Sequence, residues 1–149
     1  MKGLSHIAVR TKDLDASLRF YRDIMGLEEA FRLCGDDGKP FLIYVYIAPN
    51  QFIELFPNGE RRQEQGRDVI GFQHICLEVE DVEAAYRTMR ERGAPIDSEI
   101  IDGKAKCRQF WMHDPDGNPI ELMELPPQSC QYQATARILA QRGGEESGR

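Results

Sequence analysis

The stretch SHIAVR at Ser5–Arg10 has a second copy in the chain, QHICLE at Gln73–Glu78. Each copy is followed by the acidic start of a helix, and each half closes on the tripeptide Ile-Glu-Leu, at Ile53–Leu55 and Ile120–Leu122. The two halves are nearly equal in length, since the two histidines lie 68 positions apart and the two glutamates 67. An internal repeat indicates similar units, each of which packs on its copy. The sequence therefore predicts two modules in one domain.

Apolar patterns predict strands near the start and the end of each half. Alternation with a period of two is typical of a strand with one buried face, and β-branched and aromatic residues favour strands as well. The predicted strands are, in chain order, Leu4–Arg10, Phe41–Ile47, Gln51–Phe56, Phe72–Val79, Arg108–His113 and Pro119–Leu125. A helix is expected between Asp13 and Gly26 and another between Val82 and Gly93, because glycine is a natural helix stop. Each half therefore reads strand, helix and further strands, an α+β arrangement.

Two breaks in the pattern set the predicted boundaries. Pro57–Arg67 is polar and charged without periodicity, so we expect it to link the modules. Pro126-Pro127 ends the last strand. The prediction is a single domain at residues 1–125, with module 1 at about 1–58 and module 2 at about 70–125, followed by a C-terminal tail at 126–149. Within the tail, a short helix is expected at Ala134–Gln141 and disorder over Gly143–Arg149.

The composition is that of an ordinary globular domain. With 149 residues, 41% of them hydrophobic, the chain is long enough to bury one core. Its net charge of −6 argues against nucleic acid as a ligand, since phosphate binding needs a basic surface. No secretory leader pattern and no long apolar run is present, so a cytoplasmic protein without membrane contact is expected. The four cysteines lack zinc-site spacing and are expected to be reduced thiols.

The repeated histidine and glutamate are the candidate functional residues. The set consists of His6, Glu54, His74 and Glu121. Imidazole and carboxylate suit divalent nickel, zinc, cobalt, manganese or iron, and two of each would leave a six-coordinate dication two open positions, as in catalytic sites. A single histidine on a strand is more often hydrogen-bonded scaffold, and a single glutamate at a strand end is usually solvated. The recurrence of both residues in each half favours the metal site.

These residues, together with several short motifs, resemble the vicinal oxygen chelate (glyoxalase/bleomycin resistance/dioxygenase) superfamily, and most closely its glyoxalase I (lactoylglutathione lyase) branch. The motifs are His6, Phe20-Tyr21, Met25–Leu27, His74-Ile75 and Asp114–Leu122. The resemblance covers roughly residues 1–125. It implies two βαβββ modules whose curled mixed sheets form a metal-binding cup, one divalent metal per site, and a homodimer with shared active sites.

The second ligand position distinguishes the branches of this superfamily. Extradiol dioxygenases and fosfomycin-modifying transferases use two histidines and one glutamate, and methylmalonyl-CoA epimerases tend to have an amide where this chain has Glu54. Glyoxalase I of the bacterial type carries the complete His, Glu, His, Glu set. Arg10 and Asn58 resemble that branch's contacts to the γ-glutamyl end of glutathione, and Lys104 resembles a lysine that binds the glycyl carboxylate. Arg10 as a surface charge and Asn58 as a turn residue remain alternatives.

The implied function is that of a metal-dependent glyoxalase I-like lyase or isomerase. Its substrate would be the hemithioacetal of a 2-oxoaldehyde with glutathione or another thiol, converted through an ene-diolate. Glu121 is the expected catalytic base, with Glu54 as its counterpart across the metal. Cys76 is expected to be a buried packing thiol rather than a nucleophile. Two alternatives stay open: another superfamily enzyme (epimerase, thiol transferase or extradiol-type dioxygenase), and a metal-free drug-binding protein of the bleomycin-resistance kind.

Overall fold

The structure, a computed structural model, describes residues 3–62, 64, 66 and 68–146, with side chains up to Arg142. The first module contains β1 (His6–Arg10), α1 (Leu14–Leu18), the π-helix η1 (Arg19–Ile24), β2 (Glu28–Cys34), β3 (Pro40–Ala48) and β4 (Gln51–Phe56). The second contains β5 (Ile75–Glu78), α2 (Val82–Glu91), β6 (Ile101–Asp102), β7 (Arg108–His113) and β8 (Pro119–Glu124), and α3 (Cys130–Glu146) follows. Each module thus has the order βαβββ.

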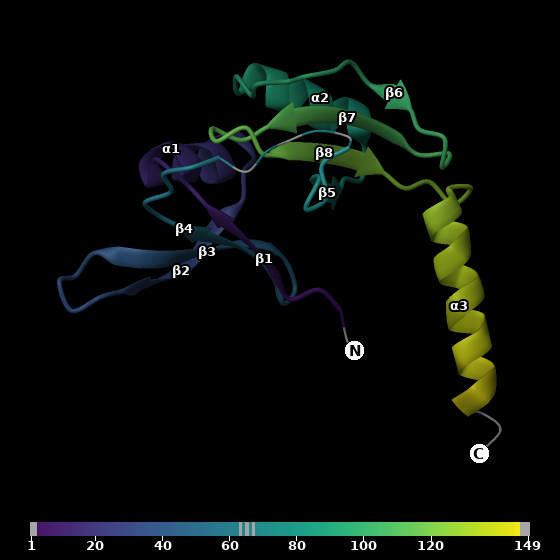
Figure 1. Ribbon diagram of the computed structural model, residues 1–149. Helices are drawn as coiled ribbons and strands as arrows, with labels where there is room; N and C mark the ends of the chain where they lie inside the picture. Colours follow the sequence, from purple (N-terminus) through teal and green to yellow (C-terminus); the bar gives the residue numbers. More distant parts are fainter. Residues whose placement is uncertain (1–2, 63, 65, 67, 147–149) are drawn as a thin grey trace.

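Each module forms one mixed four-stranded sheet, in the order β1-β4-β3-β2 and β5-β8-β7-β6. The first strand of each module pairs in parallel with the last strand, and the other neighbours are antiparallel. β1 and β5 are therefore edge strands. Figure 1 shows the two sheets as separate layers that do not close into one barrel. The predicted α+β fold of two βαβββ modules is confirmed. In the described part of one chain, the two sheets do not close around a common cavity.

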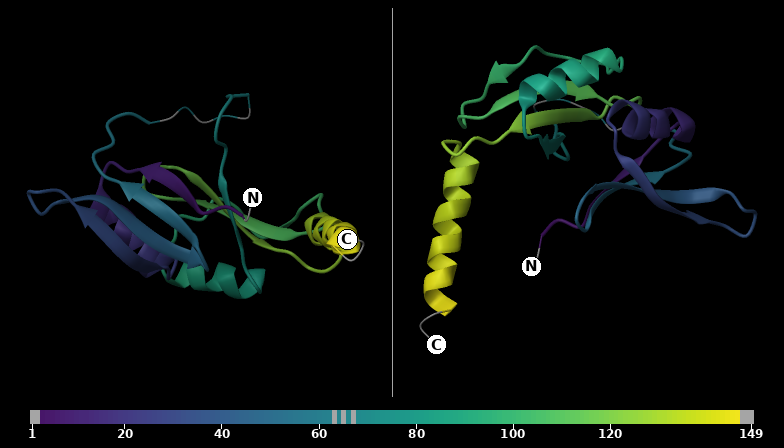
Figure 2. Two further views of the ribbon diagram at one scale, coloured as in Figure 1. Left: turned by 90° about the horizontal axis from the view of Figure 1, so that it is seen from below. Right: turned by 180° about the vertical axis from the view of Figure 1, so that it is seen from behind.

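The helices bury one face of each sheet. α1 packs against β4, and α2 packs against β7 and β8, as the views in Figure 2 show for each layer. The buried core combines apolar side chains from both modules: Leu18, Phe20, Tyr21, Ile43, Val45, Ile53, Leu55, Val82, Met89, Phe110, Met112, Ile120 and Leu122. Side chains alternate along a strand, so a residue between two core positions faces away from the helices. This places Glu54 and Glu121 on the open faces of their sheets.

The turn between β7 and β8 joins the two modules. Asp114, which is buried, accepts a hydrogen bond from the Tyr21 hydroxyl at 2.9 Å. Asp116 accepts one from the Thr11 hydroxyl at 2.6 Å, just beyond the end of β1. Both partners belong to the first module. The turn motif of the second module therefore also fixes the position of α1, η1 and the end of β1.

The start of the linker is held against the first module. The Gly59 backbone N–H donates to the Thr11 carbonyl at 2.8 Å, and a Cβ atom at position 59 would lie 3.3 Å from the Thr11 backbone. Glycine permits this close approach. Among the described residues of the predicted linker Pro57–Arg67, none belongs to a helix or strand, and positions 63, 65 and 67 lie outside the described part of the chain.

Several elements differ from the sequence predictions. β2 and β6 were not predicted, and the helix expected between Asp13 and Gly26 is divided into α1 and η1. The pattern of β2 is broken by a register irregularity between Glu29 and Phe31, and β6 has only two residues. The strand expected at Phe72–Val79 begins at Ile75, so the second histidine of the repeat lies just before the strand.

The tail is helical over a longer range than expected. α3 covers Cys130–Glu146, whereas the sequence predicted a helix at Ala134–Gln141 and disorder over Gly143–Arg149. The prediction of disorder is wrong for 143–146, where the backbone continues the helix, and residues 147–149 lie outside the described range. α3 projects away from both sheets (Figure 1). No helix in the described part of the chain is long and apolar enough to cross a membrane.

Candidate active site

His6 and Glu54 lie side by side on the first sheet. The parallel register of β1 and β4 places Phe52 opposite His6 and Glu54 opposite Ala8. Residues two apart share a face, so His6 and Glu54 point to the same side of the sheet. The Nε2 atom of His6 lies 3.5 Å from Oε2 of Glu54, and Glu54 is only 6% exposed. A buried carboxylate is unfavourable without a polar or charged partner, and the imidazole is within reach.

His74 and Glu121 repeat this arrangement on the second sheet. β5 and β8 are parallel, and Cys76 lies opposite Glu121. Ala8 has the same position opposite Glu54 in the first module. The Nε2 atom of His74 lies 3.3 Å from Oε2 of Glu121, which is 7% exposed. The Trp111 ring meets the His74 ring edge-on, with 4.9 Å between the ring centroids. Each module therefore presents one imidazole–carboxylate pair at equivalent positions.

Two further side chains adjoin these pairs. Tyr44 on β3 lies opposite Glu54, and its hydrogen bond with that carboxylate, together with burial, raises the pKa of Tyr44. The prediction that Cys76 is buried is wrong, because the residue is exposed. Its thiol group is only partly shielded from solvent. Burial and the Glu121 carboxylate raise the pKa of the Cys76 thiol to about 12. The thiol is thus protonated at neutral pH, which disfavours a nucleophilic role.

The four predicted metal ligands form two pairs, not one cluster, in a single chain. Within the residues that the structure describes, no three histidine, cysteine, aspartate or glutamate side chains are grouped so that they could hold one metal ion. Each pair supplies one nitrogen and one carboxylate oxygen donor. These donor types fit nickel, zinc, cobalt, manganese or iron. The donor chemistry therefore suits the expected metal. In one chain, however, each imidazole–carboxylate pair supplies only two of the four predicted metal ligands.

The three predicted substrate-binding residues lie at separate places. Arg10 donates from Nη1 to the Pro57 carbonyl at 2.9 Å, and its guanidinium carbon lies 5.4 Å from the centroid of the Phe56 ring. Asn58 is exposed and has a φ of 64°, which asparagine tolerates in turns. Lys104 is exposed in the turn between β6 and β7. Only Arg10 of the three lines the pocket along β1.

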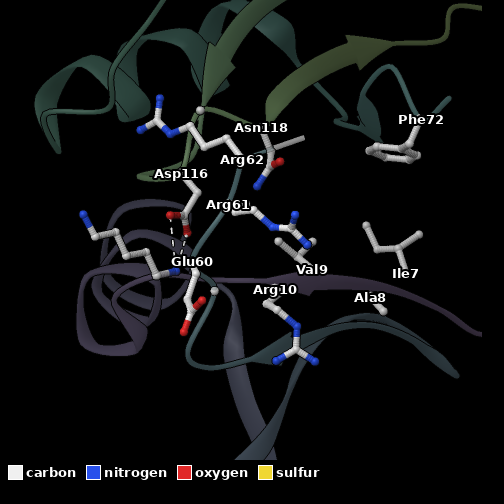
Figure 3. A pocket seen from close by; sticks show the side chains of 13 residues that line it. Ile7, Ala8, Val9, Arg10, Glu60, Arg61, Arg62, Phe72, Asp116 and Asn118 are labelled. Atoms are coloured by element: carbon white, nitrogen blue, oxygen red, sulfur yellow. Dashed lines mark hydrogen bonds between the residues drawn. The ribbon is translucent and has the colours of Figure 1, made fainter. Parts of the chain in front are cut away.

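That pocket has a volume of about 460 Å³ and lies on the edge of β1. Its walls come from Ile7–Arg10 with Lys12, from Gly59–Arg62, from Phe72 and from Asp116–Asn118. Figure 3 shows Arg61, Arg62 and Arg10 around it with their guanidinium groups pointing in different directions, and the Phe72 ring on the opposite side from Arg62. The sequence patterns did not single out the cations of this pocket other than Arg10. The adjacent arginines at 61 and 62 were the only available signal, and they lie in a stretch without periodicity.

Comparison with known proteins gives the family. Residues 3–122 match the family model described as Glyoxalase/Bleomycin resistance protein/Dioxygenase superfamily. The chain is 34% identical over 126 residues to a "Probable lactoylglutathione lyase" of Synechocystis sp., with 81% of this chain and 94% of that protein covered. It is 35% identical over 98 residues to an "Ethylmalonyl-CoA/methylmalonyl-CoA epimerase" of Cereibacter sphaeroides, with 62% of this chain and 72% of that protein covered.

A solved structure has the same fold. The crystal structure of a glyoxalase family protein from Enterococcus faecalis matches with a TM-score of 0.70 at 22% identity, covering 83% of this chain and 98% of that chain. The region matched by the family model contains both modules and both imidazole–carboxylate pairs, and it ends before α3. The chain therefore belongs to the glyoxalase/bleomycin resistance protein/dioxygenase superfamily.

Proposed function

We propose that this protein is a metal-dependent lyase or isomerase of the glyoxalase I type, which acts on the hemithioacetal of a 2-oxoaldehyde and glutathione or another thiol. The observation that carries the proposal is the repeated imidazole–carboxylate contact, at 3.5 Å in the first module and 3.3 Å in the second. Buried carboxylates beside histidines are candidates for proton transfer and metal binding. The Synechocystis relative named as a probable lactoylglutathione lyase supports the same reaction class.

The proposed site is shared by two copies of the chain. Each copy carries one pair of donors on the open face of each sheet, and neither pair is a complete metal site. A two-fold axis can bring the first module of one copy to the second module of the other. Each of the two resulting sites would then contain two histidines and two glutamates. The open edges of β1 and β5 leave both sheets accessible to such a partner. The proposal therefore includes a homodimer with two equivalent sites.

The side chains have distinct roles in this proposal. A bound divalent cation would supply Lewis-acid stabilisation of the oxygen charge that develops on the substrate. His6 and His74 would hold it as neutral ligands, together with Glu54 and Glu121. Glu121 removes the proton from carbon and returns it to the neighbouring carbon, because its carboxylate lies on the open face of the second sheet beside His74. Arg10 binds a carboxylate of the thiol cosubstrate.

An epimerase is the second candidate function. The Cereibacter sphaeroides relative carries that name at 35% identity. Epimerisation next to a thioester carbonyl also removes a proton from carbon and returns one, so the same two carboxylates could serve. The resemblance to methylmalonyl-CoA epimerases implies an amide at the position of Glu54, and the carboxylate found there favours the lyase.

Metal analysis and two parallel assays test the proposal. The purified chain is expected to contain about one divalent metal per chain and to convert methylglyoxal with glutathione. Chelation should abolish this activity, and nickel, zinc, cobalt or manganese should restore it. Solvent-proton exchange into methylmalonyl-CoA would indicate the epimerase instead, and oxygen uptake with a catechol would indicate a dioxygenase. A chain that binds no divalent metal would refute the proposed function.

A further inference from the structure

We propose that the pocket along β1 binds a small organic dianion, a phosphate monoester or a dicarboxylate, that carries an apolar or aromatic body. The binding groups are Arg61, Arg62 and Lys12 for the anion, and Phe72 for the apolar part. The proposal concerns ligand binding. It relies on the proposed function only for the further idea that this ligand is the substrate or cosubstrate.

The charge of the pocket is opposite to that of the protein. Four cationic side chains line it, from Arg10, Lys12, Arg61 and Arg62, against two carboxylates, from Glu60 and Asp116. The local balance is therefore two positive charges in a chain whose net charge is −6. Clustered cations in a concave site raise the local concentration of anions. A ligand with two negative charges would neutralise this excess.

One of the two carboxylates is already engaged by the protein. Asp116 accepts hydrogen bonds from the Thr11 hydroxyl at 2.6 Å and from the Lys12 backbone N–H at 3.3 Å. It is thus part of the contact between the modules. Within the described part of the chain, neither Arg61 nor Arg62 forms an ion pair with a carboxylate. Their guanidinium groups retain donors for an oxyanion, which they can bind in a bidentate manner.

The opposite side of the pocket is apolar. Phe72 is 47% exposed although it is aromatic, and Ile7 and Val9 belong to the same lining. In Figure 3 the Phe72 ring and Ile7 lie together on one side, whereas Asp116 and Glu60 lie on the other, with Arg61 and Arg10 between them. Separate apolar and cationic walls favour a ligand that has an apolar body and an anionic group at one end.

The size and position of the pocket fit a small metabolite next to the candidate site. Its volume of about 460 Å³ lies within the range of typical small-ligand sites, roughly 300–1,000 Å³. Ile7 directly follows His6 on β1, and Ala8 is the register partner of Glu54. A ligand in the pocket would therefore lie along the strand that presents the first imidazole–carboxylate pair.

Calorimetric titration of the metal-free full chain tests this inference. Metal-free protein is used so that phosphate binding to a cation cannot contribute, and so that the result does not depend on turnover. The probes are phenyl phosphate and benzylmalonate, which are dianions with an aromatic ring, and neutral benzyl alcohol. The relative affinity for the two dianions shows whether phosphate or dicarboxylate is preferred. Inorganic phosphate serves as the probe without an apolar part.

At least one aromatic dianion is expected to bind at least tenfold more tightly than benzyl alcohol. The double variant Arg61→Gln/Arg62→Gln should weaken this binding at least tenfold, whereas the control Arg137→Gln/Arg142→Gln, with the same charge change on exposed α3, should not alter it. Phe72→Ala should weaken phenyl phosphate and leave inorganic phosphate unchanged. Affinity in the unmodified chain should also decrease with added sodium chloride.

The inference is overturned if neither dianion binds, or if binding survives the Arg61→Gln/Arg62→Gln change undiminished. Salt-independent binding in the unmodified chain would also overturn it, whatever the behaviour of the variants. The metal and lyase assays of the proposed function can succeed or fail independently of these titrations, so the two proposals are separable.

Discussion

The Tyr21 hydroxyl donates a hydrogen bond of 2.9 Å to the Asp114 carboxylate, and this contact connects η1 of the first module to the turn of the second. Both residues are almost completely buried. Burial and the neighbouring Asp114 charge raise the pKa of Tyr21 well above its usual value, so the phenol remains neutral and acts as a donor. The relative placement of the modules therefore depends on a polar contact as well as on the apolar core.

Replacing this tyrosine should destabilise the fold. Tyr21→Phe removes the donor and leaves a buried carboxylate with one hydrogen bond fewer, which is expected to cost about 1–3 kcal/mol in unfolding free energy. Urea denaturation monitored by circular dichroism measures the change. Tyr132→Phe, on exposed α3, is the matched control and should change stability by less than about 0.5 kcal/mol. Equal stability of Tyr21→Phe and the control would show that the hydrogen bond contributes nothing.

The same tyrosine predicts a loss of stability at alkaline pH. The pKa of Tyr21 is raised in the folded state above its unfolded value, which is about 10. The folded state therefore holds the proton more tightly, and this contribution is complete below about pH 10 and is lost as the pH rises further. Denaturation curves between pH 9 and 11 should show a steeper decline for the unmodified protein than for Tyr21→Phe. Parallel declines would contradict the assignment.

Glu121 should be needed for turnover more than for folding. Glu121→Gln keeps the size of the side chain and removes the base, so we expect kcat to fall by at least about 100-fold, with a folded protein that retains some metal. Steady-state assays and metal analysis of the same sample measure both effects. Glu91→Gln, an exposed position at the end of α2, is the control. A Glu121→Gln enzyme with near-normal kcat would exclude this residue as the base.

Mixing two inactive variants should restore activity if the site is shared. In a dimer of one Glu54→Gln chain and one Glu121→Gln chain, one site receives both intact glutamates and the other receives neither. Random mixing makes half of the dimers mixed, so about a quarter of the normal activity is expected after joint refolding. Sites built within single chains would yield no recovery, and that result would refute the shared arrangement.

Most of α3 should be dispensable for the stability of the two modules. The described side chains from Thr135 to Arg142 are all exposed. Ending the chain after Ala134 is therefore expected to change the unfolding free energy by less than about 0.5 kcal/mol. Ending it after Gln128 also removes buried Ser129 and the hydrogen bond from the Cys130 N–H to the Ala105 carbonyl, and should cost about 1 kcal/mol. Thermal denaturation of both truncated chains provides the comparison.

The strands that could be predicted are those with a continuous pattern. Gln51–Phe56 was predicted with its correct ends, because apolar residues flank the glutamate on both sides and a turn precedes it. β2 escaped prediction because the register slips between Glu29 and Phe31 and because the Glu29–Arg32 ion pair, at 2.6 Å, puts charged residues into the strand. A bulge changes which face each residue occupies, and alternation then fails as a signal.

The candidate site was only partly accessible from the sequence. The repeat predicted that His6, Glu54, His74 and Glu121 hold one metal ion together. The structure brings each histidine to the glutamate of its own module, because the first and last strands of each module pair in parallel. Among the described residues of one chain the two pairs do not form one cluster, and the proposed meeting of the pairs across a dimer is a contact between copies that no local pattern encodes. The pocket along β1 was missed because its walls come from segments that are far apart in the sequence, such as those of Val9, Arg61 and Asp116.

Hydrogen bonds between the two modules are expected to hold the modules together even when the linker between them is cut. Their contacts include the hydrogen bonds of Asp114 and Asp116 and one from Arg92 to the Ile24 carbonyl at 3.1 Å. The segment that joins them in sequence contributes no helix or strand in its described residues. Cutting the polypeptide there would remove a tether and leave these bonds intact, so two fragments produced together should reassemble, with the tether contributing mainly effective concentration.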